Sequence, residues 1–428
     1  MSLAVEQTRI QLGRRYRQFL NLLEFEGKRG IADRLRLAAA QRLAPKQITM
    51  PVKGADILTA DLSLPFQPTI PKLIPKQPII INWVTIPAGP GGGGHTTLFR
   101  IIRHLQAHGY HNRVYFYNVY RADHRYYEHI IRSSYGFNGC VATLDAGMKD
   151  AHAVVATSWP TAYPVFNSRC AGKRFYFIQD FEPYFYPAGA LSLLAENTYR
   201  MQFHGITIGR CFVEKLKSDF GMSVDSFEYG CDISRYCRLD GVKRFGVVFY
   251  ARPEAARRGC EIGLMALEAF AARRPDVEIH LYGTRMGNLP FRFTDHGRIS
   301  PEELNHLYNR CYAGLSLSLT NVSLVAHEML AAGCIPVVND SVWNRTDIAS
   351  SFVRYAPADP HRLAAELEAV ITTGDFDSVS RAAAASMHSR TWDDAGEKVD
   401  EIFRRVLGVS PHVSSPSLQW RPALSPAD

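Results

Sequence analysis

The segment LSLSLTNVSLVAHEMLAAGCIPVVND, residues 315–340, carries the clearest signal of the fold. Its apolar beginning predicts a strand over 313–318, and the run that follows predicts a short helix over 323–332. Gly333 suits the left-handed position that ends a helix. The apolar segment 335–338 then predicts a second strand. A strand, a helix and a strand in close succession predict a β-α-β unit whose strands lie in one parallel sheet.

The same alternation runs outward from this unit in two series, the first beginning at Ile79 and the second at Phe245. The predicted strands are 79–85, 113–118, 153–157, 174–179, 205–209, 225–229, 245–251, 277–282, 313–318, 335–338 and 352–355. The predicted helices are 95–108, 124–134, 211–220, 259–273, 301–310, 323–332 and 360–371, with another within 189–200. Apolar strands that alternate with helices indicate parallel sheets covered on both faces. We therefore expect an α/β protein with two doubly wound, Rossmann-like domains that face a cleft.

Composition changes along the chain suggest how these domains are bounded. Proline residues at 65, 68, 71, 75 and 78 mark an extended connector, and the last residues are rich in Ser and Pro. The predicted segments are 1–50 (basic helical extension), 51–235 (first Rossmann-like domain), 236–390 (second Rossmann-like domain), 391–408 (an amphipathic helix, about 393–406, packing back on the body) and 409–428 (disordered tail).

Charge and cysteine content narrow the class of protein. The net charge is +8, but residues 1–50 hold ten Lys and Arg against four Asp and Glu, so the remaining chain is nearly neutral. This distribution favours an enzyme-like body over a nucleic-acid-binding surface. The eight cysteines include no C-x-x-C pair, and no apolar run approaches the roughly 20 residues that span a bilayer. Since the chain also lacks an apolar signal core, we expect a cytoplasmic protein.

The N-terminal extension predicts a helix over 5–45 with one apolar face among arginines. Leu12, Tyr16, Phe19, Leu20 and Leu23 recur at helical spacing on that face. The pattern is typical of a helix that docks on its own chain or on a protein partner. It also fits a helix that lies on an anionic membrane surface, which would make the protein peripheral to the membrane. The sequence leaves both partners open.

A glycine-rich loop, PAGPGGGGH (residues 87–95), separates the first strand from its helix. Glycine costs backbone entropy, so the five glycines within 89–94 need a ligand or a tight turn as their reason. Free N–H groups at a helix N-terminus attract anions, and a phosphate or sugar that approaches the backbone here is one interpretation. An NAD site expects an acidic residue where Asn118 stands, and an ATPase loop expects a Gly-Lys-Ser/Thr run that is missing. A purely structural turn is the other interpretation.

Arginines follow the first strand of the second series, in FYARPEAARRG (residues 249–259). Arg252 ends the predicted strand, and Arg257 and Arg258 open the next helix. Open α/β sheets bind ligands at the carboxyl ends of their strands, and guanidinium groups hold phosphates bidentately. Glu328, on the predicted helix 323–332, could accept two hydroxyl groups, as from a ribose. The alternatives are a surface ion pair for the arginines and a solvated helix face for Glu328.

These residues resemble the retaining nucleotide-sugar glycosyltransferases of family 4, which have the two-domain GT-B fold. EMLAAGCIPVV (328–338) is similar to the family's segment after its second glutamate, and GRISPEELNHLYNRCYAGLSLS (297–318) to its nucleobase-side segment. YGCD (229–232) is similar to the family's hinge, and GGHTTLFRIIRHLQAHGYHNRV, from residue 93 on, to its glycine pair and first helix. The first glutamate of the family's pair falls at Thr320, and Arg258 takes the place of its lysine.

The resemblance implies a donor site on the second domain. The implied contacts are Glu328 with the ribose, Arg252, Arg257 and Arg258 with the diphosphate, the N–H groups of Asn321, Val322, Ser323 and Leu324 beside it, Ile299 on the nucleobase side, and Gly93 and Gly94 closing over the phosphates from the first domain. His95, at the start of the helix, could touch the donor, and a helix-capping or exposed histidine is the alternative. Positive groups and a helix terminus can stabilise a departing diphosphate without a metal. We therefore expect no metal and no cofactor besides the donor, and we interpret the Asp375–Asp377 pair as a surface turn.

The acceptor is expected on the first domain. Asp180 and Glu182 follow a predicted strand in an aromatic loop, where they would bind sugar hydroxyls or help with proton transfer. Trp159 and Tyr184 would stack on sugar faces, and a structural cap is the alternative for either carboxylate. VATSWPTAYPVFN (155–167) and FIQDFEPYFYP (177–187) look like the branch that builds rhamnose-containing bacterial surface polysaccharides. This implies dTDP-rhamnose as donor and an oligosaccharide or lipid-linked glycan as acceptor, with UDP-hexose and GDP-mannose left open.

Two other classes of function remain at this point. A nucleotide-binding oxidoreductase or regulator could use the same α/β layers, although Asn118 and the arginines at 252 and 258 argue against it. A non-catalytic scaffold of a glycan-assembly complex could use the N-terminal helix as its contact.

Overall fold

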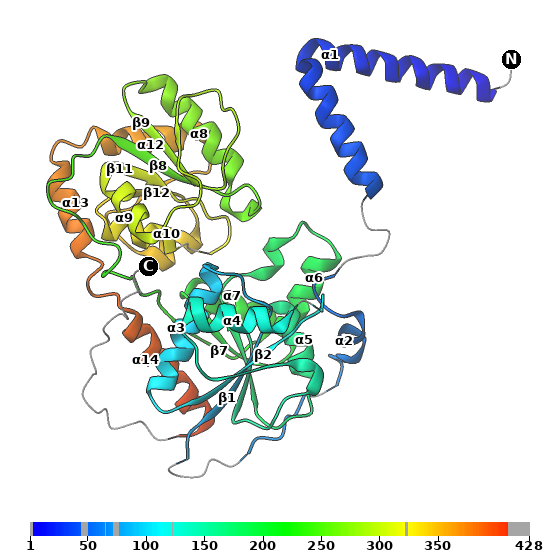
Figure 1. The fold of residues 1–428 in the computed structure, drawn as a ribbon, viewed down its shortest axis with the longest axis vertical. Coiled ribbons are helices and arrows are strands. Elements are labelled where there is room, and N and C mark those ends of the chain that lie inside the picture. Colours follow the sequence, from blue (N-terminus) through cyan, green and yellow to red (C-terminus); the bar gives the residue numbers. More distant parts are fainter. Residues whose placement is uncertain are drawn as a thin grey trace. The chain divides into compact units, whose positions relative to one another are not determined.

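The computed structural model describes residues 3–43, 50–64, 66–71, 77–121, 123–321 and 324–409. The chain divides into two compact units, Met1–Pro51 and Val52–Asp428. The first unit holds helix α1 (Leu3–Leu43), in which Gly27 breaks the helical backbone with φ 62° and ψ −161° (Figure 1). Within this unit the predicted apolar face, Tyr16, Phe19, Leu20 and Leu23, is exposed, while the side chain of Leu12 lies outside the described part.

The second unit begins with a seven-stranded sheet whose order is β3-β2-β1-β4-β5-β6-β7 and whose neighbours are all parallel. Its strands are β1 (Ile80–Thr85), β2 (His111–Phe116), β3 (Cys140–Thr143), β4 (Ala153–Ala156), β5 (Lys173–Ile178), β6 (His204–Ile208) and β7 (Val224–Phe227). Its helices are α2 (Gly54–Thr59), α3 (Gly93–Ala107), α4 (His124–Tyr135), α5 (Trp159–Asn167), α6 (Ala190–Asn197) and α7 (Cys211–Phe220). The near-continuous burial of β1, β4 and β5 is what a parallel sheet covered on both faces requires.

A second parallel sheet follows, with six strands in the order β10-β9-β8-β11-β12-β13. Its strands are β8 (Gly246–Ala251), β9 (Glu278–Gly283), β10 (Thr294–Asp295), β11 (Cys311–Leu315), β12 (Ile335–Asn339) and β13 (Arg354–Ala356). Its helices are α8 (Cys260–Arg273), α9 (Pro301–Arg310), α10 (Leu324–Ala331), α11 (Val342–Ile348), α12 (Pro360–Ile371) and α13 (Phe376–Ala385). The expected fold class, two Rossmann-like sheet domains with a helical extension, is confirmed.

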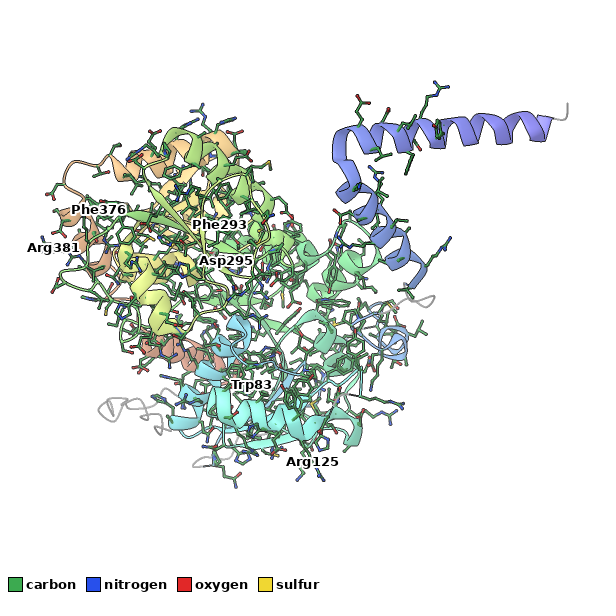
Figure 2. The ribbon with its side chains drawn as sticks, turned by 45° about the horizontal axis from the view of Figure 1, so that its top comes forward. Trp83, Arg125, Phe293, Asp295, Phe376 and Arg381 are labelled. Atoms are coloured by element: carbon green, nitrogen blue, oxygen red, sulfur yellow. The ribbon has the colours of Figure 1, made fainter. Side chains whose placement is uncertain are left out.

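The last helix, α14 (Trp392–Leu407), follows the second sheet domain in sequence but packs on the first. Its apolar face contributes Ala395, Val399, Ile402 and Phe403 to the first core. The ring of Phe403 lies edge-on to Trp83 of β1, with 5.8 Å between the centroids. Trp83 is fully buried, and Figure 2 labels its position in the first sheet domain. Burial of an aromatic pair of this size favours docking of α14 by several kcal/mol, of the order of 1.5–3 for each side chain.

Several elements are missing from the sequence-based prediction, and each has a physical reason. Strands β3 and β10 are short edge strands with little apolar patterning. Helices α5 and α11 have nine and seven residues, and α5 contains two prolines. The predicted tail lies almost wholly in 410–428, outside the described residues.

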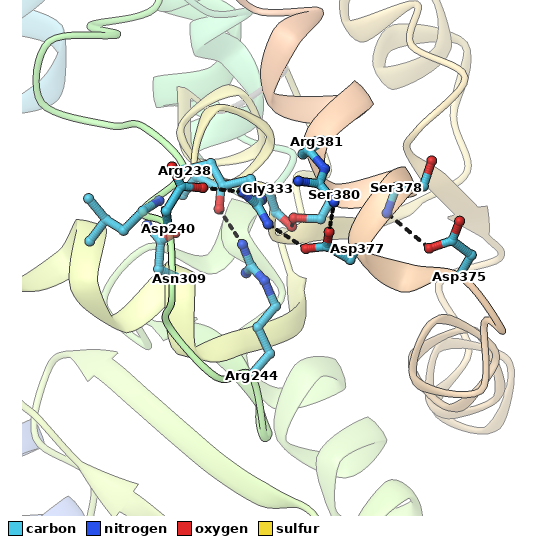
Figure 3. A network of polar contacts seen from close by, with 12 residues as sticks. Arg238, Asp240, Arg244, Asn309, Gly333, Asp375, Asp377, Ser378, Ser380 and Arg381 are labelled. Carbon is cyan, nitrogen blue, oxygen red and sulfur yellow. Dashed lines mark hydrogen bonds and ion pairs between the residues drawn. The ribbon is translucent and has the colours of Figure 1, made fainter.

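Helix α13 accounts for the Asp375–Asp377 pair, which was expected to be a surface turn. The Asp375 carboxylate caps the helix by accepting from the N–H of Ser378 at 3.2 Å. Asp377 lies in its first turn and is ion-paired with Arg238 and Arg381 (Figure 3). The pair is therefore a helix start rather than a turn, and both carboxylates contact protein groups.

Candidate functional site

The order of each sheet reverses at one point, and that point locates the candidate site. In the first sheet β1 lies between β2 and β4, and in the second β8 lies between β9 and β11. Loops that leave the carboxyl ends of such strands diverge, which opens a crevice for a ligand. The glycine loop follows β1, and the arginine loop 252–259 follows β8. Both segments singled out from the sequence therefore stand at switch points.

Two arginines are held beside the loop that follows β11. The arginine loop turns through a short 3₁₀ helix, Ala256–Arg258. Arg258 Nη1 donates to Ser318 Oγ at 2.7 Å. Arg257 Nε lies 3.2 Å from Asp180 Oδ2, and its guanidinium stands 4.3 Å from the centre of the Phe185 ring. Both side chains are half-buried, so their charges act in a medium that screens less than bulk water.

Asp180 connects the two sheet domains. It follows β5, is buried, and accepts from the N–H of Phe181 at 2.8 Å and from Thr320 Oγ1 at 3.2 Å. Burial raises the pKa of Asp180, while the positive charges of Arg258 and Arg257 act in the opposite direction. One carboxylate from the first domain is therefore the counter-ion for two arginines of the second.

The loop after β11 is fixed by polar contacts on both sides. Asn321 Nδ2 donates to the carbonyl of Gln179, next to Asp180, and Ser318 N–H donates to Asn339 Oδ1 at 2.8 Å. The predicted N–H donors Val322 and Ser323 lie outside the described residues. Leu324, the fourth predicted donor, begins α10.

Glu328 lies half-buried on α10, and its carboxylate has no hydrogen bond to any residue in the described part of the chain. Burial raises the pKa of Glu328 to about 7, and Asp232 adds to this increase, whereas the charge of Arg100 lowers the pKa. Arg100 Nη2 in turn donates to Asp232 Oδ2 at 2.8 Å. A carboxylate that has lost part of its water without gaining a partner is a group prepared for a ligand. Glu328 therefore does not lie on a solvated helix face, which was the alternative that the sequence left open.

Arg252 is placed differently from Arg257 and Arg258. Its side chain is exposed, with Nε 3.2 Å from Glu254 Oε1, and Glu254 also accepts from Thr284 Oγ1. This is the surface ion pair that the sequence left as the alternative. The structure does not bring Arg252 into contact with Asp180 or with the loop after β11.

Neither backbone conformation nor close packing requires glycine at most positions of the glycine loop. Gly91 requires its flexibility because its φ is +72°. A Cβ atom at Gly93 would meet nothing within 4 Å, and one at Gly94 would only touch the Gln179 side chain at 3.5 Å. His95 Nε2 lies 3.3 Å from Thr85 Oγ1, and burial lowers the pKa of His95, which keeps the ring neutral at pH 7. The first turn of α3 therefore presents backbone N–H groups with space beside them.

The acceptor-side residues divide into an exposed and a buried group. Tyr184 is 50% exposed and remains available to a sugar. Trp159 is only 2% exposed and its ring lies edge-on to Tyr163 and Tyr186, so the prediction that it stacks on a sugar is wrong: no ring face is free.

Glu182 points into the first domain. It accepts from the N–H of Trp159, at the start of α5, and from Tyr176 Oη at 3.0 Å. Burial raises the pKa of Glu182 to about 8. Its contacts are those of the structural cap that the sequence left as the alternative.

The structure adds Arg100, Thr320 and Tyr229 to the site, which the sequence did not predict, and places the predicted Ile299 in the second core. Arg100 stands seven residues after Gly93 on α3, so helical periodicity alone would have placed both on one face. Thr320 is a direct partner of Asp180, and Tyr229 lies 3.5 Å from Asn321 Nδ2. Ile299 packs half-buried against the second core.

Comparisons with known proteins show which families and folds the chain is similar to. Residues 246–368 match the family model of the WsaF C-terminal domain. A relative in Myxococcus xanthus, the O-antigen biosynthesis protein RfbC, is 32% identical over 270 residues, which is 60% of this chain and 21% of RfbC. The chain therefore spans about a fifth of that relative's length.

Solved structures share the architecture at low identity. Alr3699/HepE from Anabaena, solved with UDP and glucose, superposes with a TM-score of 0.60 at 15% identity over 76% of this chain and 100% of that one. Sucrose-phosphate synthase from Thermosynechococcus elongatus gives 0.59 at 13% identity over 78% and 100%. WaaG, a glycosyltransferase involved in lipopolysaccharide biosynthesis, gives 0.53 at 13% identity over 76% and 99%. The chain has the GT-B fold of these glycosyltransferases.

Proposed function

We propose that this chain is a retaining glycosyltransferase that moves a sugar from a nucleoside diphosphate to a glycan acceptor in the assembly of a surface polysaccharide. The observation that carries the proposal is the pair Arg257 and Arg258 at the switch point of the second sheet, with the buried Asp180 of the first domain as their counter-ion. The similarity to RfbC favours O-antigen-type polysaccharide as the product class. Segments 155–167 and 177–187, which resemble the branch that builds rhamnose-containing polysaccharides, favour dTDP-rhamnose as donor.

The proposed donor site uses groups at the edge of the second sheet. Glu328 would accept the ribose hydroxyls, which would supply the hydrogen bonds that its carboxylate lacks. Arg257 and Arg258 would hold the diphosphate, together with the N-terminus of α10. Arg252 would assist only after leaving Glu254. The glycine turn of α3 would cover the phosphates from the opposite side.

The chemistry follows from where negative charge develops. The bond between the sugar C1 and the diphosphate oxygen breaks, and a bond from C1 to the acceptor oxygen forms on the same face. The arginines stabilise the charge on the departing diphosphate, at roughly 3–4 kcal/mol for each well-placed donor group. The acceptor proton passes to the leaving phosphate oxygen or to Asp180, so no metal is needed in this scheme.

Asp180 has a second part in this scheme. In the structure it stands where a diphosphate would meet Arg257. A donor must therefore displace it or share the arginines with it. In either case a carboxylate remains beside the sugar end of the donor, which suits contact with a sugar hydroxyl or with the acceptor proton.

The N-terminal unit offers a contact with the assembly machinery. Tyr16, Phe19, Leu20 and Leu23 are exposed among basic residues, and the part of the chain that the structure describes contains no helix long and apolar enough to cross a membrane. We assign this face to an anionic membrane surface or a protein partner, at which a lipid-linked acceptor would be met.

A donor-binding screen tests the proposal. Thermal unfolding and calorimetric titration with dTDP, UDP, GDP and NAD should show stabilisation and binding by one nucleoside diphosphate and none by NAD. Donor hydrolysis that disappears in Glu328→Ala would exclude the scaffold alternative. Binding of NAD alone, or of none of the nucleotides at millimolar concentration, would overturn the proposal.

A further inference from the structure

A group of metal-ligating side chains lies at the opposite end of α3 from the glycine loop. His104 lies in the last turn of the helix and His108 is its C-cap residue, and their rings stack with 4.2 Å between the centroids. Glu397 faces them from α14. One ligand atom of each of the three residues lies within 4.8 Å of the others. Two histidines at this spacing with a glutamate form a ligand set that holds Zn²⁺ in other proteins.

The hydrogen bonds of His108 prepare one ring nitrogen for a metal. His108 Nδ1 lies 2.8 Å from the backbone carbonyl of His104. Since a carbonyl oxygen only accepts, Nδ1 must carry the proton, and Nε2 keeps its lone pair. An Nδ1–H bonded to a carbonyl is the usual support of a metal-binding imidazole.

His104 has an unexplained polar atom. Its side chain is 10% exposed, and Nε2 is buried with no hydrogen-bond partner in the described structure. Its other nitrogen, Nδ1, lies 3.9 Å from Asp393 Oδ1. Buried polar atoms without partners are rare in folded proteins, and an ion is one of the few explanations.

Helix α14 packs closely against the His104 ring at Gly396. A Cβ atom at Gly396 would lie 2.2 Å from Cγ of His104, so only glycine fits at that position of α14. Glu397 is the next residue and is exposed, with no ion pair to the described cations. Asp400, one turn further on, is already paired with Arg404. The free carboxylates nearest to the histidines are therefore Glu397 and Asp393.

We propose that His104, His108 and Glu397 bind one Zn²⁺, with Asp393 or a water molecule as the fourth ligand. Imidazole with carboxylate suits Zn²⁺, whereas Mg²⁺ and Ca²⁺ prefer oxygen ligands alone. Tetrahedral Zn²⁺ needs ligand atoms about 3.3 Å apart, so small side-chain rotations suffice. The ion would tie α14, which follows the second sheet domain, to α3 of the first.

This site is separate from the proposed donor site and does not depend on it. His104 stands eleven residues beyond Gly93, which is about 17 Å along the helix. The expectation of a metal-free protein rested on the diphosphate chemistry and on the Asp375–Asp377 pair, and both lie apart from this end of α3. The role of the ion is to brace the C-terminal helix rather than to act on a substrate.

Metal titration of the full chain tests the proposal. After chelator treatment, Zn²⁺ should bind with one-to-one stoichiometry and raise the melting temperature, and Co²⁺ should give the visible absorption of a tetrahedral site. His108→Ala and Glu397→Gln should each weaken binding at least tenfold and abolish the thermal shift. His129→Ala, which removes an exposed histidine of α4, is the matched control and should change neither. No binding at 100 µM Zn²⁺, or binding that both variants retain, would overturn the proposal.

Discussion

Replacing Asp180 by asparagine should tighten the binding of a nucleoside diphosphate. The carboxylate lies 3.2 Å from Arg257 Nε, so a phosphate held by the same guanidinium would have its charge about 5 Å from that of Asp180. At an effective dielectric constant of about 20, two like charges at this distance repel by about 3 kcal/mol. Salt and water reduce the effect to about 1.5–3 kcal/mol, which is roughly a 10- to 150-fold lower Kd for Asp180→Asn.

Calorimetric titration of the wild type and the variant with the preferred nucleoside diphosphate measures this directly. Asp347→Asn is the matched control, because Asp347 is a half-buried carboxylate that also links the two sheet domains, where it accepts from the N–H groups of Arg210 and Cys211. Its replacement should leave nucleotide affinity unchanged. Sugar transfer by Asp180→Asn should fall even as nucleotide affinity rises, because the carboxylate also serves the sugar or the acceptor. Unchanged or weaker binding by Asp180→Asn, in a variant that remains folded, would refute the assignment of Arg257 and Arg258 to the diphosphate.

Three further predictions follow from the same contacts. Arg258→Ala should raise the Kd for the nucleoside diphosphate by roughly 10- to 150-fold, because one charge-assisted contact contributes about 1.5–3 kcal/mol. Arg252→Ala removes an exposed side chain and should change this Kd less than about fivefold. Equal losses of affinity in titrations of the two variants would contradict this contrast. Burial raises the pKa of Glu182 from 4.5 to about 8, so the folded state holds a proton that the unfolded chain releases, and the wild type loses stability as pH rises through this window. The melting temperature of Glu182→Gln minus that of the wild type should therefore increase from pH 5 to pH 9, and a difference independent of pH would show that this carboxyl is not titrating. Gly396→Ala should lower the free energy of unfolding by about 1–3 kcal/mol in denaturant titrations because its Cβ collides with His104, and a neutral result would mean that α14 docks differently.

The fold was predictable because its strongest signals are local. Each strand of the two sheet cores is a short apolar run, and the helices between them show clear periodicity, so the alternation that defines a doubly wound domain is legible along the chain. The segment 315–340 was predicted as strand, helix and strand, and the structure gives β11, α10 and β12. Short elements such as α11 escaped because seven residues carry too little pattern.

The candidate site was predictable only in part, because its geometry depends on contacts between segments distant in sequence. The position of Arg258 after a strand indicated a ligand-facing group, and the structure places it beside Ser318. That Arg257 pairs with Asp180 while Arg252 pairs with Glu254 on the surface was not predictable, since neighbouring side chains on one loop differ in direction by backbone details that sequence does not reveal. Trp159 failed as a sugar platform for a similar reason: an aromatic residue near a site is as well suited to the core, and α5 turns it inward.

Sugar transfer itself is the most direct test of the account. The full chain would be incubated with dTDP-rhamnose, UDP-hexoses and GDP-mannose, each with a rhamnose-terminated acceptor, and the products followed by nuclear magnetic resonance. We predict release of the nucleoside diphosphate from one donor, a new glycosidic bond with the anomeric configuration of that donor, and loss of both in Glu328→Gln. Absence of transfer from every donor, or turnover that Glu328→Gln leaves intact, would contradict the claim that the crevice between the two sheets is a sugar-transfer site.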